Sequence, residues 1–195
     1  MNLIERVKKI MVEPKNEWAV IDQEETQVAE LVTGYLLLLA LIPAVAVFLR
    51  YGLFGFGHVF EPSISWGLKQ AIISFVATVG GAFLSAWVID ALATSFGSTK
   101  NFRKAMQLVV YSYTPMMLAG VFQLIPVLSI LGIVGLYGLY LLYLGISPLM
   151  KTPEDKVVGY FIVSLLVIVI VYVVLFAFLG AILVGGAMAS GMMTP

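Results

Sequence analysis

Long apolar runs alternate with short polar connections along this chain. Five runs are long enough for a membrane-spanning helix, which needs about 20 apolar residues at a rise of about 1.5 Å each. They cover residues 31–49, 71–93, 105–125, 128–149 and 157–184. Only Pro126 and Val127 separate the third run from the fourth, so these two are predicted to form a tight hairpin.

Composition supports a membrane protein. Of 195 residues, 61% are hydrophobic and 11% are charged, and the mean hydropathy is +1.03. Soluble domains carry about 25% charged residues. A soluble fold of this length could not bury so much apolar surface. The predicted fold class is therefore all-α: a polytopic membrane protein with a five-transmembrane-helix bundle.

The positive charges predict the orientation of the bundle. With the N-terminus in the cytosol, nine lysines and arginines fall on the inner side, whereas only Arg50 and Lys69 fall outside. Cytoplasmic loops of membrane proteins are enriched in these residues. We therefore expect an N-in, C-out topology, which agrees with an odd number of spans.

Three regions are expected along the chain: a cytoplasmic N-terminal segment (1–30), the transmembrane domain (31–185) and a flexible tail (186–195). In the first, one helical face is apolar (Leu3, Ile4, Val7, Ile10, Met11) and the other is charged (Glu5, Arg6, Lys8, Lys9). This pattern predicts an amphipathic interfacial helix on the inner membrane surface. A short helix packed on its own bundle is an equal alternative. The acidic stretch "QEETQVAE" is expected to be solvated.

Polar residues inside the predicted spans suggest a candidate intramembrane site. Asp90 is the only acidic residue within a span, and buried carboxylates in membranes usually have a partner. It could serve an ion, proton or headgroup site, or it could pair with Arg103 or Lys104 and act structurally. The third span contains Tyr111, Ser112, Tyr113, Thr114 and Pro115.

Pro115 predicts a kink, because proline frees the carbonyl four residues earlier, that of Tyr111. The Ser112 and Thr114 hydroxyls could satisfy that carbonyl, and the two tyrosines could donate to neighbouring helices. The alternatives are a packed kink and a polar cavity at mid-membrane.

The fourth span carries two series with a spacing of three. One consists of glycines and the other of tyrosines: Gly132, Gly135 and Gly138, and Tyr137, Tyr140 and Tyr143. Glycines allow another helix to approach closely, so a helix-contact face is expected, with a lipid groove as the alternative. In the second connection, Lys100, Arg103 and Lys104 form a basic patch that either sets topology or binds anionic lipid headgroups.

Several functions are disfavoured by what the sequence lacks. The zero net charge argues against a nucleic-acid partner. With no cysteine and one histidine, the chain offers neither a thiolate nor a two-histidine metal site, and no cofactor is expected. No nucleophile–base pair or phosphate-binding loop is evident, so a non-enzymatic protein is predicted.

The motifs "YSYTPMMLAGVF" and "GLYGLYLLYLGISPLMKTPEDK" resemble the bacterial branch of the Yip1 domain family. The family-like positions are Tyr111, Tyr113, Pro115, Tyr140, Leu141, Tyr143, Leu144 and Gly145. The resemblance implies five membrane helices, a cytoplasmic N-terminus and a bacterial inner-membrane location. Eukaryotic relatives act in vesicle traffic, and some bind Rab GTPases. This chain shows neither their long soluble N-terminal region nor a DLYGP-type motif, so Rab-type binding is not expected.

Two functions are weighed. The first is a membrane-organising or partner-recruiting protein, acting by wedge-like insertion at the inner leaflet and by homo-oligomerisation through the fourth span. The second is a small oligomeric channel, transporter or lipid-translocating protein, with Asp90 and the Tyr111–Pro115 kink lining a polar path.

Overall fold

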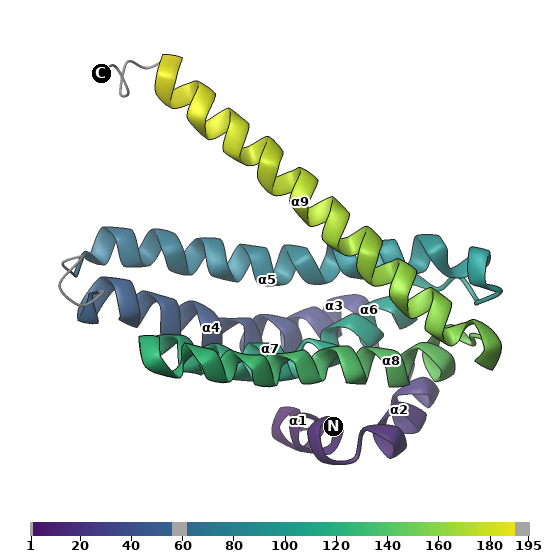
Figure 1. The fold of residues 1–195 in the computed structure, drawn as a ribbon. Coiled ribbons are helices and arrows are strands. Elements are labelled where there is room, and N and C mark those ends of the chain that lie inside the picture. Colours follow the sequence, from purple (N-terminus) through teal and green to yellow (C-terminus); the bar gives the residue numbers. More distant parts are fainter. Residues whose placement is uncertain (1, 56–61, 190–195) are drawn as a thin grey trace.

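The computed structural model describes residues 2–55 and 62–189, and within these ranges every regular element is a helix. Five helical segments are long and apolar enough to cross a membrane: Val28–Phe54, Ile64–Phe96, Phe102–Leu124, Val127–Met150 and Glu154–Val174. The five predicted spans are thus confirmed. The first two are longer than expected at both ends. Figure 1 shows four spans side by side and the last one crossing them obliquely.

Two short helices, α1 (Leu3–Val12) and α2 (Pro14–Gln23), precede the first span. The Asn2 side chain caps α1 by accepting the Ile4 N–H at 3.1 Å, and Pro14 starts α2 without losing a helical hydrogen bond. Ile10, Trp18 and Ile21 are fully or almost fully buried. The N-terminal hairpin, α1 with α2, therefore packs on its own bundle, beneath α8 in Figure 1.

The predicted faces of α1 are wrong at two residues. Arg6, expected on the solvated face, is 4% exposed, whereas Ile4, expected on the apolar face, is 74% exposed. Arg6 is buried because its acidic partners, Glu17 and Glu24, lie on the inner side of the hairpin. The other charged residues of the helix stay exposed, and the other residues of the expected apolar face pack against the core.

The first span consists of α3 (Val28–Leu31), a π-helical turn η1 (Val32–Leu36), α4 (Leu37–Phe48) and a second π-helical turn η2 (Leu49–Phe54). The second span, α5 (Ile64–Leu92), starts at Ser63, whose side chain accepts the Trp66 N–H. It continues as a 3₁₀ turn, η3 (Ala93–Phe96), and stops at Gly97, whose φ of 69° is easy only for glycine.

The third span breaks beside Pro115, as the sequence predicted. Helix α6 (Phe102–Ser112) ends before Tyr113, and α7 (Thr114–Ala119) and the 3₁₀ turn η4 (Gly120–Leu124) complete the span. A Cβ on Gly120 would lie 2.6 Å from the Pro43 Cβ, so the first and third spans cross closely at this glycine. The predicted hairpin then leads directly into the fourth span.

The fourth span begins as a 3₁₀ helix, η5 (Pro126–Leu136), and continues as α8 (Tyr137–Met150). A 3₁₀ helix has three residues per turn, so a spacing of three keeps residues on one face. Gly132 and Gly135 lie in this 3₁₀ helix, whereas Gly138 lies in α8. A short 3₁₀ turn, η6 (Glu154–Lys156), leads to α9 (Val157–Ala189). Helix α9 extends four residues into the region expected to be a tail, and residues 190–195 lie outside the described residues.

Candidate functional site at the charged end of the bundle

The N-terminal hairpin and two connections meet at one end of the bundle, which we call the charged end. Lys151 Nζ lies 2.6 Å from Asp22, and Arg103 lies 2.6 Å from Glu25. The second and fourth connections are joined by the Thr99 N–H, which donates to the Met150 carbonyl at 2.8 Å. The charge count also assigned the N-terminus and these two connections to a common side.

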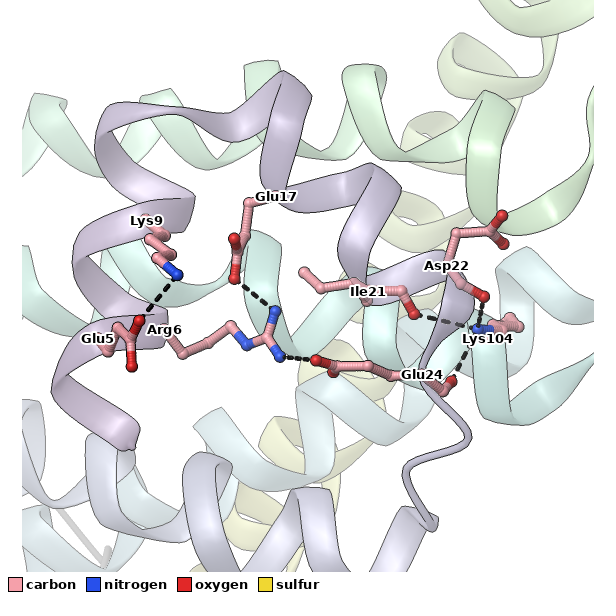
Figure 2. Close-up of polar contacts among 8 residues, drawn as sticks. All are labelled: Glu5, Arg6, Lys9, Glu17, Ile21, Asp22, Glu24 and Lys104. Atoms are coloured by element: carbon pink, nitrogen blue, oxygen red, sulfur yellow. Dashed lines mark hydrogen bonds and ion pairs between the residues drawn. The ribbon is translucent and has the colours of Figure 1, made fainter. Parts of the chain in front are cut away.

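A buried ion network ties the two helices of the hairpin to each other. Arg6 Nη1 lies 2.5 Å from Glu17 Oε1, and Arg6 Nη2 binds Glu24 (Figure 2). Burial on its own lowers the pKa of the Arg6 guanidinium, but the hydrogen bond to Glu24 and the surrounding charges raise this pKa overall. The network therefore keeps Arg6 charged.

Lys104 fastens the hairpin from the side of the third span. Its ammonium donates to the carbonyls of Ile21, Asp22 and Glu24 at 3.1, 2.6 and 3.0 Å (Figure 2). These are carbonyls at the C-terminal end of α2, where a helix leaves acceptors without intrahelical donors. Lys104 thus acts as a C-terminal cap supplied by another helix.

Tyr111 of the third span lies between the hairpin and the first span. The Arg6 Cζ is 5.3 Å from the centre of its ring, a cation–π distance. The rings of Trp18 and Tyr35 contact it edge-on, at centroid distances of 6.3 and 4.9 Å. The Tyr35 hydroxyl is in turn 2.8 Å from Thr114 Oγ1.

The kink therefore sends its polar groups in two directions rather than into one site. Tyr111 and Thr114 face the hairpin and the first span, whereas the Tyr113 hydroxyl lies 2.9 Å from Ser85 Oγ on α5. The predicted donation from Tyr113 to a neighbouring helix is present. Among the described residues, Thr114 bonds to Tyr35 instead of the freed Tyr111 carbonyl, and Ser112 Oγ has no hydrogen-bond partner.

A cavity of about 160 Å³ lies beside the kink, between α5, α6, α8 and α9. Ser85, Ser112 and Tyr113 contribute to its wall, but most of the lining is apolar. The structure therefore has a cavity beside the kink, as one alternative expected, but the cavity is mainly apolar rather than polar.

Asp90 lies elsewhere on α5 and is 8% exposed. Neither expected basic partner pairs with it, since Arg103 binds Glu25 and Lys104 binds the end of α2. No hydrogen-bond partner reaches Asp90 Oδ1 from the described part of the chain. Next to it, the Tyr160 hydroxyl donates to the Ile89 carbonyl at 2.5 Å.

The glycines of the fourth span make contacts within this chain. A Cβ on Gly138 would lie 2.4 Å from the Ser112 carbonyl oxygen, and one on Gly135 would lie 3.2 Å from the Met116 Cα. Gly132 faces open space. The third and fourth spans thus pack together through two of the three glycines.

The three tyrosines of this span differ in their surroundings. Tyr137 donates to the Met11 carbonyl on α1 at 3.2 Å, and Tyr143 packs edge-on against Phe161. Tyr140 is 45% exposed.

Sequence reasoning missed Arg6, Glu17, Glu24 and Tyr35 as network members. The acidic stretch expected in water supplies two ion-pair partners, Glu24 for Arg6 and Glu25 for Arg103. One available signal was the pair Trp18 and Ile21, spaced by one helical turn, which marks a face of α2 that must be buried and carries Glu17 with it.

Comparison with known families gives one match: residues 8–178 match the Yip1 domain. No curated protein and no solved structure matches the chain. The match begins within α1 and ends within α9, so it includes the second half of α1, all of α2 and the five membrane spans. This chain therefore belongs to the Yip1 domain family.

Proposed function

We propose that this chain is a non-catalytic protein that organises its membrane or recruits partners from the charged end of the bundle. The observation that carries the proposal is that Lys104 of the third span binds the end of α2, while the ion pairs of Arg6 with Glu17 and Glu24 tie α1 to α2. Because these contacts fix the hairpin against the third span, its outer surface is a preformed platform. The charge distribution favours the cytosolic side, and the resemblance of the motifs favours a bacterial inner membrane.

The outer surface of the platform is suited to contact with lipid or protein. Ile4, Val12 and Val20 are 74%, 67% and 46% exposed, and Lys8 and Lys15 are also exposed. Apolar side chains beside lysines favour insertion at the boundary of an anionic leaflet. This arrangement supports the wedge-like mechanism.

The test replaces the three apolar residues with serine in the full chain: Ile4→Ser, Val12→Ser and Val20→Ser. We expect loss of any effect of the protein on liposome size and of partners recovered by cross-linking in native membranes. The matched control changes three other exposed polar residues of the same hairpin without changing its net charge, Glu13→Gln, Asn16→Asp and Gln23→Asn. Equal results for both triple variants would contradict the platform.

Homo-oligomerisation is the second part of the proposal. Gly135 and Gly138 are used inside the chain, whereas Gly132 is open, and Ile130 and Ile133 beside it are 77% and 66% exposed. We place the contact between copies at this part of η5. Gly132→Leu should lower the oligomeric state seen by native mass spectrometry, and an unchanged state would exclude this contact.

A transport path is the alternative function, and a specific observation favours it. Asp90 Oδ1 is buried without a hydrogen-bond partner among the described residues, and unsatisfied carboxylates in membranes mark ion or proton paths. A flux assay in proteoliposomes compares Asp90→Asn with the parent. A flux in the parent that the variant loses supports transport, whereas equal flux, or none from either, removes Asp90 from such a role.

A further inference from the structure

A polar cavity of about 190 Å³ opens beside the Arg6 network. Its wall comes from α1, the linker between α2 and α3, the start of the first span and α6. The polar lining residues are Arg6, Glu24, Thr26, Glu30, Tyr35 and Tyr111. It is separate from the exposed outer surface of the hairpin that the proposed platform uses.

The cavity has a surplus of negative charge. The one guanidinium, Arg6, is shared by the carboxylates of Glu17 and Glu24. Glu30 lies exposed at the rim and makes no ion pair within the described ranges. The lining therefore holds two carboxylates, Glu24 and Glu30, and one cation, Arg6, whose charge is already shared with Glu17 outside the cavity. This imbalance favours a positively charged ligand.

The chemistry of the wall favours an organic ammonium group over a metal ion. No three metal-ligating side chains converge anywhere in residues 2–55 and 62–189. The rings of Tyr35 and Tyr111 lie in the wall instead, and aromatic rings attract ammonium groups.

The position of the cavity points to a lipid as the source of the ammonium. Leu31, Gly34 and Tyr35 belong to the first two turns of the first span, and the end of a membrane-spanning helix lies close to the lipid headgroups. From Gly34, spacings of four, three and four lead to Leu38, Leu41 and Val45, each about half exposed. Leu41 and Val45 then line an apolar groove of about 360 Å³ between α4 and α5, which is suited to an acyl chain.

We propose that this cavity binds the headgroup of a phospholipid that carries a primary ammonium, of the phosphatidylethanolamine type. Glu30 and Glu24 accept hydrogen bonds from the ammonium, the tyrosine rings flank it, and the acyl chain follows the first span towards the groove. The π-helical turn η1 places Gly34 without a side chain at the entrance.

The test measures lipid retention by the purified full chain with native mass spectrometry. The probes are phosphatidylethanolamine and its N-acylated form, in which an amide replaces the ammonium. Glu30→Gln removes the rim charge and keeps the shape, and should lower the preference for phosphatidylethanolamine about fivefold. Gly34→Leu should abolish the preference by filling the entrance, where an added Cβ meets nothing within 4 Å.

Glu154→Gln is the matched control, since Glu154 is an exposed carboxylate at the same end of the bundle and outside the cavity. It should behave as the parent. The proposal is overturned if the parent does not distinguish the two lipids, or if its preference survives both Glu30→Gln and Gly34→Leu. Displacement of the lipid by free phosphoethanolamine or by a lysine peptide at equal concentration would also overturn the assignment to a lipid. None of these results depends on whether the outer surface of the N-terminal hairpin binds lipid or protein.

Discussion

Arg6 and Glu17 form an ion pair across the N-terminal hairpin, with Nη1 and Oε1 2.5 Å apart and both side chains 5% exposed. Glu24 binds the second guanidinium nitrogen, so Arg6 has two partners of opposite charge. A buried pair of this kind contributes little over a well-packed apolar replacement, but removing one partner leaves an uncompensated charge. Removal of Arg6 should therefore loosen α1 from α2 and, through the lost contact with Tyr111, the hairpin from the bundle.

Arg6→Met should undock the hairpin. It leaves Glu17 buried without its cation, at a cost of roughly 3–5 kcal/mol for a broken buried pair. We expect faster hydrogen exchange across α1 and α2 and faster proteolysis between them, while the five spans stay protected.

Two further variants test this interpretation. Arg6→Met combined with Glu17→Met should recover most of the protection, because the buried charge is then gone. Lys9→Met breaks only the exposed pair with Glu5, and exposed ion pairs contribute little to stability. Equal protection in Arg6→Met and Lys9→Met would show that the buried network does not hold the hairpin.

Gly145→Ala should displace Trp18. A Cβ at Gly145 would lie 2.8 and 2.9 Å from the indole Cε2 and Cζ2 and 2.5 Å from Leu108 Cδ1. Overpacking of this kind costs about 1–3 kcal/mol. Trp18 fluorescence, measured with Trp66 and Trp87 replaced by phenylalanine, should shift to longer wavelength.

Gly132→Ala is the control for that substitution, because Gly132 faces open space. Its Trp18 emission should match the parent. If Gly145→Ala also leaves the emission unchanged, the hairpin does not rest on the fourth span as described.

Tyr35→Phe should lower the stability of the contact between the first and third spans. The change removes the buried hydrogen bond to Thr114, and such bonds in membrane bundles are worth about 0.6 kcal/mol. A small drop in the thermal midpoint in detergent is expected. Tyr140→Phe, at an exposed tyrosine, should produce none, and an equal drop in both variants would argue against the specific bond.

The exposed pair Glu5 and Lys9 should make a small contribution that depends on pH. The hydrogen bond and charge of Lys9 hold the pKa of Glu5 below its usual value. A carboxyl group with a lowered folded-state pKa contributes stability above its unfolded pKa and loses it as pH falls. The difference in α1 protection between the parent and Glu5→Gln should therefore be present at pH 7 and vanish as pH falls through the lowered pKa of Glu5. A difference that grows in acid would contradict this sign.

The spans and the kink could be predicted from the sequence because they depend on local properties. Twenty apolar residues and a proline act within one segment, and the glycine spacing of three already matched the 3₁₀ geometry of the fourth span. The Arg6 network could not be predicted in this way. Its partners are 11 and 18 positions away, and a charged residue on an amphipathic helix is usually solvated.

The partners of the basic patch could not be predicted for the same reason, because they too lie far away in the sequence. Lys104 and Arg103 looked available for anionic headgroups, yet their side chains bind the end of α2 and Glu25. Of the three patch residues, Lys100 is the one fully on the surface. Whether a side chain is free or engaged depends on where the hairpin docks, which the pattern of a single segment does not contain.

The most direct test of the account is the side of the membrane on which each end of the bundle lies. The chain has no cysteine, so single cysteines at Asn16, Ser65 and Glu154 can be labelled with an impermeant maleimide in sealed vesicles. The account predicts that Asn16→Cys and Glu154→Cys react from the cytosolic side and Ser65→Cys from the opposite side. Labelling of Asn16→Cys and Glu154→Cys from opposite sides, or of all three from one side, would contradict a five-span bundle with the N-terminal hairpin docked at its charged end.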